Sequence, residues 1–392
     1  MSRLYLIFLA VVLILSSCQT PIPPKYKADF DAALLKSGDN KMEWLKAIKE
    51  APADQREAVV FLISYMPERD LKELKADFIL ENTRLAFEAR EKYTWCKNLP
   101  DSIFYNDVLP YVSLNERRDN WRQDFMNRFD PFVAECKTIA EAIDSVNRNI
   151  LDVVKVEYNT KRKKADQSPY ESVEQGMASC TGLSILLTDA FRAVGIPSRI
   201  AGTPLWTNMR GNHNWCEVWI DGDWYFTEYY PDALNKSWFL TDAGKADPEK
   251  PIHWIYASSY KPTGLSFPCV WDDSIKYVHA ENVTGRYIRL YQEQLTCEEL
   301  QEGEVIVDVA LYRNNSSGDQ RICSKIEVLK GDEVIDFGYS PSPTDDLNKF
   351  LKFKLKKGLE YTFRFKDETG NNLEENLTIN AENKPVKLYQ TK

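Results

Sequence analysis

Residues able to do chemistry gather in the stretch Gly176-Met177-Ala178-Ser179-Cys180-Thr181-Gly182. Apolar residues then recur at three- and four-residue spacing, which predicts an amphipathic helix that ends at Gly195. Cys180 would lie in the first helical turn, with Ser179 as the N-cap. Unpaired backbone N–H groups and the positive end of the helix dipole favour a thiolate there. Cys180 is therefore a candidate nucleophile, and an unreactive buried cysteine is the competing interpretation.

A histidine and an acid are brought together if residues 213–220 and 223–228 form a β-hairpin. Asp221-Gly222, which lies between the two segments, is a strong signal for a two-residue turn. Pairing about this turn makes His213 and Glu228 diagonal neighbours on one face, roughly 7–8 Å apart at the backbone. A histidine oriented by a carboxylate can accept a proton from a thiol and return it to a leaving group. The hairpin thus predicts a histidine oriented by an acid, which is the pair that a nucleophile of the triad type needs.

Three motifs carry a family resemblance: Gly176-x-x-x-Cys180, Gly195-Ile196-Pro197-Ser198-Arg199, and the run from Asn212 to Tyr225 that contains His213-Asn214-Trp215-Cys216-Glu217-Val218. Together they resemble the transglutaminase-like superfamily, whose core is related to that of papain. The resemblance covers about residues 168–238. It implies an α+β fold in which a helix packs on an antiparallel sheet. It also implies that Cys180 is the nucleophile, His213 the base and Glu228 the third member.

The third position departs from the family pattern, which usually has aspartate where this chain has Glu228. An offset alignment would place Asp232 there instead, but Asp232 lies beyond the expected end of the strand. Glu228 is the preferred acid for that reason.

Several groups are candidates for contacts with the substrate or with an oxyanion. The backbone N–H of Cys180 is a natural donor at a helix N-terminus. Gln175 could supply a side-chain amide, as a glutamine does in papain-like enzymes. Trp206 could border the thiol, although simple packing is the preferred interpretation, and Trp215 is a further candidate for contact with the substrate or the oxyanion. No cysteine and histidine spacing of the structural-zinc type occurs, so neither a metal nor a cofactor is expected.

The N-terminal sequence has the pattern of a secretory signal peptide. Arg3 precedes an apolar run over residues 4–15, and Ser16-Ser17-Cys18 follows. Leu15-Ser16-Ser17-Cys18 resembles the bacterial lipobox, which implies cleavage before Cys18 and lipid on its sulfur. We therefore expect a lipid anchor at Cys18 in the cell envelope, with the outer membrane as the expected location. A helical segment that precedes the transglutaminase-like core in exported proteins of gut Bacteroidetes is also resembled by Val108-Leu109-Pro110-Tyr111, Asn115-Glu116 and Trp121-Arg122.

The length of 392 residues allows two or three domains. We expect a signal peptide over 1–17, a tether over 18–24, a helical region over 25–150, a transglutaminase-like domain over 151–280 and a β-sandwich over 281–392. The net charge of −9 disfavours nucleic acid as a partner. Eight cysteines are spread thinly, so disulfides are allowed in an exported protein but no pairing can be deduced.

Two functions remain open from the sequence. The first is cysteine-dependent acyl transfer on amide bonds, with hydrolysis of peptides favoured over transfer to an amine. The second is a non-catalytic surface lipoprotein that uses the same groove to bind peptide or glycan.

Overall fold

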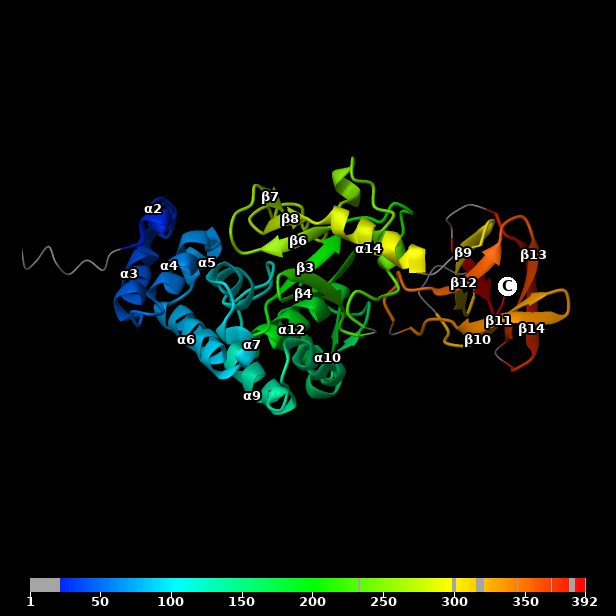
Figure 1. The fold of residues 1–392 in the computed structure, drawn as a ribbon, viewed down its shortest axis with the longest axis horizontal. Helices are drawn as coiled ribbons and strands as arrows, with labels where there is room; N and C mark the ends of the chain where they lie inside the picture. Colours follow the sequence, from blue (N-terminus) through cyan, green and yellow to red (C-terminus); the bar gives the residue numbers. More distant parts are fainter. Residues whose placement is uncertain are drawn as a thin grey trace, which may run out of the picture.

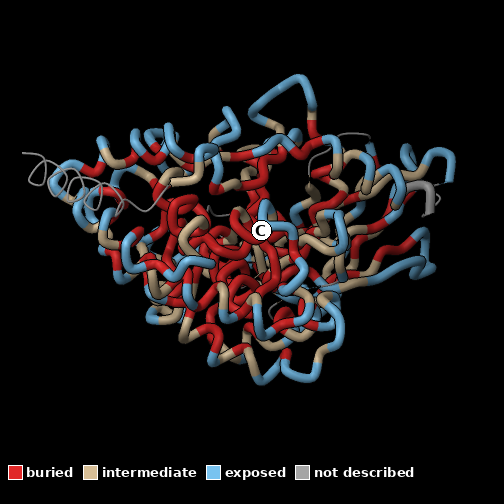
Figure 2. The backbone as a smooth tube through the Cα atoms, turned by 60° about the vertical axis from the view of Figure 1, so that its left-hand side comes forward, coloured by how far each residue is buried: buried red, intermediate tan, exposed pale blue. Residues whose placement is uncertain are grey.

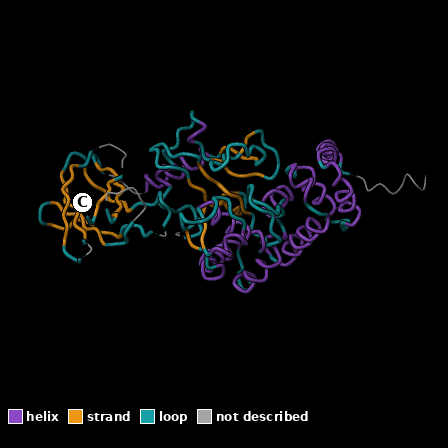
Figure 3. Tube along the Cα trace, turned by 180° about the vertical axis from the view of Figure 1, so that it is seen from behind, coloured by secondary structure: helices purple, strands orange, loops and turns teal. Residues whose placement is uncertain are grey.

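The computed structural model describes residues 22–231, 233–297, 301–314, 321–343, 345–367, 369–380 and 385–391, without the side chains of 295–297. Helices occupy one end of the molecule, a sheet with packed helices lies in the middle, and strands make up the other end (Figure 1). Seen from behind, the same three parts follow one another along the long axis (Figure 3). The expected α+β fold class is confirmed.

The N-terminal part is helical throughout, as its apolar periodicity predicts. Thr138 caps the helix that ends this part, because its side chain accepts a hydrogen bond from the Glu141 N–H. A π-helical turn, Phe104–Val108, follows α8. The helices are α2 (Lys27–Lys36), α3 (Lys41–Glu50), α4 (Arg56–Tyr65), α5 (Glu68–Glu73), α6 (Ala76–Lys92), α7 (Thr94–Lys97), α8 (Asp101–Ile103), α9 (Arg122–Val133) and α10 (Ile139–Val154).

One helix expected from the sequence is divided in two. The pattern over residues 70–93 predicts a continuous helix, but Leu74 and Lys75 are extended between α5 and α6. The side chain of Asn40 donates hydrogen bonds to the carbonyl groups of Leu71 and Leu74, at 2.9 and 2.8 Å. Tertiary contacts thus satisfy backbone groups that a continuous helix would have paired internally.

The central part is built on a six-stranded sheet in the order β5-β4-β3-β6-β8-β7. Helix α12 packs on β3 and β4. Gly202 lets β3 lie close to β4, because a Cβ there would stand 1.9 Å from the Asn214 side chain. The elements are β1 (Glu157–Tyr158), α11 (Pro169–Gln175), β2 (Met177–Ala178), α12 (Cys180–Ala193), β3 (Ser198–Thr203), β4 (His213–Ile220), β5 (Asp223–Thr227), α13 (Leu240–Ala243), β6 (Tyr256–Ser259), β7 (Leu265–Ser266), β8 (His279–Asn282) and α14 (Thr284–Cys297).

The C-terminal part is a small β-sandwich. Its sheets have the orders β11-β10-β13-β14 and β12-β9-β15, and apolar side chains from both form a common core. We call this part the C-terminal sandwich. Its strands are β9 (Glu304–Tyr312), β10 (Lys325–Lys330), β11 (Glu333–Tyr339), β12 (Leu351–Lys356), β13 (Glu360–Lys366), β14 (Asn372–Thr378) and β15 (Val386–Tyr389).

Burial is densest where the helices meet the sheet (Figure 2). One apolar core runs without interruption from the N-terminal helices into α12 and the back of β4, whereas the C-terminal sandwich has a core of its own. No helix in the described part has the length and apolar character that crossing a bilayer requires. The thiols described are all unpaired, those of Cys96, Cys136, Cys180, Cys216, Cys269 and Cys323.

Candidate active site

Cys180 is the first residue of α12, as the sequence predicts. Ser179 is the N-cap, and its hydroxyl accepts a hydrogen bond from the Gly182 N–H at 3.0 Å. The same hydroxyl donates to the carbonyl of Ala165, which holds the start of the helix against the preceding loop. Cys180 is partly exposed and borders a cavity. Its own N–H, at the first helical position, has no partner within the helix and is available to a ligand.

The predicted hairpin is present with the predicted register. Ile220 pairs with Asp223, and Cys216 pairs with Thr227. Asp221 and Gly222 both have positive φ angles, 48° and 110°, as a tight two-residue turn of this kind requires. A glycine at position 222 meets that requirement without strain. The turn therefore fixes which side chains of β4 and β5 share a face.

His213 and Glu228 meet on that face, which confirms the contact expected from the hairpin. Nε2 of His213 lies 3.0 Å from Oε2 of Glu228. The hydroxyl of Ser237 donates a hydrogen bond to the other carboxylate oxygen. Asn147 of α10 holds the backbone of Glu228 through a 2.9 Å hydrogen bond to its carbonyl. The carboxylate is thus fixed on the Nε2 side of the ring.

With Nε2 bonded to Glu228, Nδ1 is the ring nitrogen that can serve the thiol. The sulfur of Cys180, a ring nitrogen of His213 and a carboxylate oxygen of Asp346 all lie within 4.8 Å of one another. In the neutral ring that donates from Nε2, Nδ1 has a free lone pair and can accept the thiol proton. This is the arrangement that a cysteine–histidine–acid triad requires.

Trp206 packs behind His213, in agreement with the preferred interpretation, and Trp215, a candidate for contact with the substrate, lies there too. Both are buried, and their rings stack at 6.1 Å between centroids. Nε1 of Trp215 donates a 2.6 Å hydrogen bond to the hydroxyl of Tyr287. Trp238 packs on the imidazole with 4.9 Å between ring centroids and borders the cavity, and no sequence motif had indicated it. Trp206 and Trp215 therefore support the imidazole and are withdrawn from the cavity.

The side chain of Gln175 makes its hydrogen bonds to groups other than the thiol. Its side-chain oxygen accepts the Lys163 N–H at 3.1 Å, and its amide donates to the Glu171 carbonyl at 3.0 Å. Gln175 is not among the described residues that border the cavity at Cys180. The backbone N–H of Cys180 is thus the better supported oxyanion donor. Asp232 and Cys18 lie outside the described residues.

Asp346 is a site residue that the sequence did not indicate. It comes from the connection between β11 and β12 of the C-terminal sandwich, and its Oδ2 lies 3.4 Å from Nδ1 of His213. Arg321 holds the Asp346 carbonyl at 2.7 Å. The Asn348 amide donates a 2.8 Å hydrogen bond to the carbonyl of Asn212, directly before His213. No spacing rule links position 346 to a hairpin more than a hundred residues earlier.

Two carboxylates thus flank one buried imidazole. Burial opposes the charged form of His213, but Asp346, Cys180 and Glu228 outweigh it and raise the pKa of His213 well above its usual value. Burial likewise opposes ionisation of Asp346, but the neighbouring imidazolium outweighs it and lowers the pKa of that carboxyl. The two carboxylates therefore stabilise the imidazolium that forms when His213 accepts a proton.

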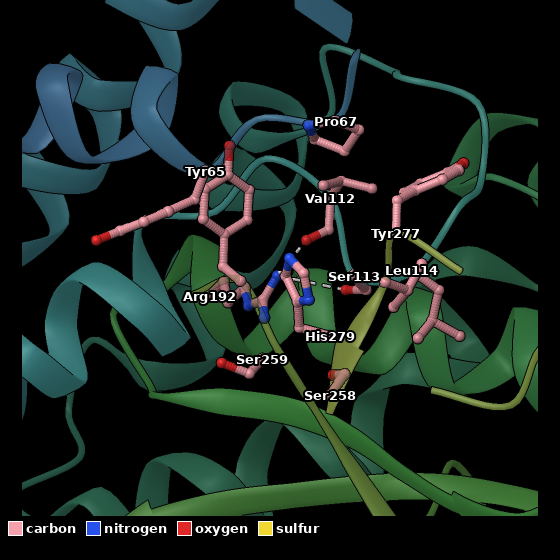
Figure 4. Close-up of a pocket in the computed structure, with 12 residues that line it drawn as sticks. Tyr65, Pro67, Val112, Ser113, Leu114, Arg192, Ser258, Ser259, Tyr277 and His279 are labelled. Atoms are coloured by element: carbon pink, nitrogen blue, oxygen red, sulfur yellow. Dashed lines mark hydrogen bonds between the residues drawn. The ribbon is translucent and has the colours of Figure 1, made fainter. Parts of the chain in front are cut away.

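The cavity at the site is small, about 50 Å³. Cys180, His213, Glu228, Trp238 and Asp346 all border it. A second cavity, of about 30 Å³, lies at the junction of the N-terminal helices and the sheet (Figure 4). There the Arg192 guanidinium donates to the Val112 carbonyl at 2.9 Å, and none of the candidate catalytic residues takes part.

Comparisons with known proteins agree with this geometry. Residues 129–229 match the family model described as the transglutaminase-like superfamily. No curated protein matches the chain.

Solved structures show weaker similarity. One is a provisionally assigned cysteine protease from Cytophaga hutchinsonii, 14% identical with a TM-score of 0.29, over 36% of this chain and 45% of that one. A second is a TGase, 12% identical with a TM-score of 0.23, over 28% and 30%. A third is a provisionally assigned protease from Parabacteroides distasonis, 9% identical with a TM-score of 0.24, over 77% and 54%. The chain thus spans less than half the length of the first of these proteins.

The matched segment begins in α9 and ends just after Glu228, so it contains the helix of Cys180 and the hairpin of His213. Over residues 129–229 the chain is therefore similar to the transglutaminase-like superfamily.

Proposed function

We propose that the protein is a cysteine-dependent acyl-transfer enzyme that hydrolyses amide bonds in peptides, with Cys180 as nucleophile, His213 as base and Glu228 as the orienting acid. The observation that carries the proposal is the 3.0 Å contact between His213 Nε2 and Glu228, together with the sulfur of Cys180, at a helix N-terminus, within 4.8 Å of a His213 ring nitrogen. This arrangement leaves Nδ1 for proton transfer with the thiol.

In the first step the Cys180 sulfur attacks the carbonyl carbon of the substrate. A C–S bond forms, the thiol proton passes to His213 Nδ1, and the developing oxyanion faces the free N–H of Cys180. The C–N bond then breaks as the imidazolium returns this proton to the departing amine. The products are an acyl-Cys180 thioester and a free amine.

In the second step water attacks the thioester. His213 accepts a proton from the water, the C–O bond forms, and the C–S bond breaks as the thiolate leaves. The same proton then returns to the sulfur, and the peptide product departs with a carboxyl group. An amine in place of water would give transamidation through the same atoms.

Capture of the acyl intermediate tests this proposal. Protein that has been treated with a chelator to remove any bound metal is incubated with a peptide library and quenched in acid. Peptides containing Cys180 are then sequenced by mass spectrometry. We expect an acyl adduct on Cys180 that is absent in Cys180→Ser and strongly reduced in His213→Ala. Cys323→Ser, which removes an exposed thiol of the C-terminal sandwich, is the matched control and should keep the adduct.

A Cys180 without adduct, and no more reactive toward iodoacetamide than Cys323, would instead favour the non-catalytic function, a lipoprotein that binds peptide or glycan. Glu228→Gln separates these outcomes further. It keeps the shape of the side chain but removes the charge that stabilises the imidazolium, so we expect adduct formation to slow by about 10²–10⁴-fold.

We also propose export to the cell envelope with a lipid anchor at Cys18. The lipobox-like stretch before Cys18 supports this part of the proposal. Metabolic labelling with a fatty acid should mark the wild-type protein and leave Cys18→Ala unlabelled. Labelling that persists in Cys18→Ala would contradict it.

A further inference from the structure

We propose that Cys180, His213 and Asp346 form a binding site for a thiophilic divalent cation, Zn²⁺ above all, which joins the C-terminal sandwich to the catalytic core. The three side chains come from the start of α12, the start of β4 and the β11–β12 connection. A thiolate, an imidazole nitrogen and a carboxylate oxygen are the three ligand types that zinc sites in proteins use.

The distances between these side chains fit one shared ion. A tetrahedral Zn²⁺ keeps its nitrogen, oxygen and sulfur ligands about 3.3–3.8 Å apart, from metal–ligand bonds of about 2.0–2.3 Å. Oδ2 of Asp346 is 3.4 Å from Nδ1 of His213, and the donor atoms of all three residues lie within 4.8 Å of one another. Closing the remaining gap needs side-chain shifts of about 1 Å or less.

The contact between Asp346 and His213 is not a good hydrogen bond. Although the two atoms are at ion-pair distance, Nδ1 of this buried histidine has no partner with hydrogen-bond geometry in the described structure. A buried ring nitrogen of this kind normally has one. A cation between Nδ1 and the carboxylate would satisfy both groups at the separation observed.

The surrounding groups support the ligands as they do in known metal sites. Glu228 holds the other ring nitrogen of His213, which is the carboxylate–histidine–metal arrangement that fixes the ring and its tautomer. The Asn348 N–H donates to Oδ1 of Asp346 at 2.9 Å and leaves Oδ2 for the ion. Hard cations such as Mg²⁺ and Ca²⁺ prefer oxygen ligands, so the sulfur and nitrogen donors select Zn²⁺ or Co²⁺.

A bound ion would occupy the atoms that the proposed reaction uses. The sulfur could not attack a carbonyl, and Nδ1 could not carry a proton. Asp346 would also remain where the departing amine must reach Nδ1, so the C-terminal sandwich would be held closed over the site. This silencing rests on the proposed function, whereas the metal binding itself does not.

The experiment uses the full chain without affinity tags, stripped with a chelator and then titrated with ZnCl₂ or CoCl₂. Calorimetry and elemental analysis give affinity and stoichiometry, and the Co²⁺ absorption spectrum reports a thiolate ligand directly. We expect the wild type to bind one more equivalent than Cys180→Ser and to show a thiolate-to-cobalt charge-transfer band. Asp346→Asn should bind at least about tenfold more weakly, and Glu228→Gln about 10–100-fold more weakly.

Asp345→Asn is the matched control, because Asp345 is the neighbouring carboxylate but pairs with Lys349 at 2.8 Å. It should keep wild-type affinity. If Asp346→Asn does not fold, the wild-type Co²⁺ band and its loss in Cys180→Ser still decide the case. A spectrum without thiolate ligation, or unchanged affinity in folded Asp346→Asn, would overturn the metal site.

Failure of the metal site and failure of the enzyme are distinguishable. The acyl adduct is measured on metal-free protein, so it can form whether or not Zn²⁺ binds. In the wild type, saturating Zn²⁺ should slow iodoacetamide labelling of Cys180 by at least about tenfold, since a coordinated sulfur is a poor nucleophile toward the reagent. Equal labelling with and without Zn²⁺ would contradict the silencing.

Discussion

The two junctions on either side of the central part, which holds the candidate active site, are built differently. On the N-terminal side, one apolar core continues from the helices into α12 and β4, and buried arginines bind backbone carbonyl groups across it. On the C-terminal side, the sandwich keeps a separate core and meets the central part through polar contacts of Arg210 and Asn348 and through the partly buried Leu347.

Arg122 illustrates the N-terminal junction. Its guanidinium donates to the carbonyls of Val108, Leu109 and Pro110 at 2.9–3.0 Å, and to that of Arg192 at 3.1 Å. Burial lowers its pKa to about 9. Because these carbonyls have no water to replace the guanidinium, this junction is part of the fold.

Arg210 illustrates the C-terminal junction. It pairs with Asp308 at 3.0 Å and with Asp242, and it packs on the ring of Phe350 at 4.8 Å. The N-terminal helices share one apolar core with α12 and β4, so moving them away would expose that core, whereas the C-terminal sandwich has its own core and meets the central part mainly through polar contacts. A residue that controls access to the thiol therefore belongs on the sandwich, where Asp346 is found.

Arg122→Met should have the largest effect. The substitution leaves several buried carbonyls without a donor, so we expect the free energy of unfolding to fall by about 3–5 kcal/mol. Urea denaturation followed by tryptophan fluorescence measures it. Arg128→Met, on the same helix but paired with Asp124 at the surface, should change it by less than about 1 kcal/mol. Equal losses in both variants would contradict the structural role of Arg122.

Asp107→Asn should change how the free energy of unfolding depends on pH, which tests the burial of this carboxyl at the N-terminal junction. Burial raises the pKa of Asp107 to about 7, against the opposing charges of Arg199 and Arg192, with Glu281 adding to the rise. Between pH 4 and 7 the folded state keeps a proton that the unfolded state releases, so this residue makes stability fall as pH rises through that window. Above about pH 7 both states have lost the proton and the contribution is level.

The variant should therefore gain stability relative to the wild type from pH 5 to pH 8, by an amount on the order of 1–3 kcal/mol. Unfolding free energies at the two pH values measure the gain. Asp152→Asn, at an exposed position of α10, is the control and should show none. A gain of the same size at both pH values would contradict the titration of Asp107.

Arg210→Ala should loosen the C-terminal junction without unfolding either part. We expect a loss of about 1–2 kcal/mol in docking, because partly buried ion pairs are replaced by water. Hydrogen exchange at residues 210–213 and 345–350 should then accelerate by about tenfold, since 1.4 kcal/mol corresponds to that factor. Arg364→Ala, in β13 and paired with Glu374 at 2.7 Å, should leave exchange at both segments unchanged.

Asn348→Ala should have the smallest effect, about 0.5–1.5 kcal/mol, because it removes one hydrogen bond to the Asn212 carbonyl. Iodoacetamide should label Cys180 faster in metal-free Asn348→Ala than in the wild type, as the segment around Asp346 opens more often. Asn371→Ala removes side-chain hydrogen bonds within the turn between β13 and β14 and serves as control. Slower labelling in Asn348→Ala would reverse the role assigned to this segment.

Local patterns were sufficient for much of the site. The N-cap at Ser179, the hairpin about Asp221-Gly222 and the contact of His213 with Glu228 all follow from interactions between residues close in sequence. Strand periodicity and turn chemistry decide such contacts before any distant part of the chain takes part. The α+β class follows from the same periodicities. The domain limits and the anchor at Cys18 stay predictions.

Tertiary structure alone decided the rest. Asn40 reaches across from another helix and divides the helix expected over residues 70–93. Trp206 and Trp215 lie inside an apolar cluster that they form with residues such as Phe239 and Tyr287. Asp346 reached Nδ1 because a separately folded sandwich docks on the loop before the hairpin. Contacts between independently formed cores depend on the shapes of finished surfaces, which no local spacing of residues encodes.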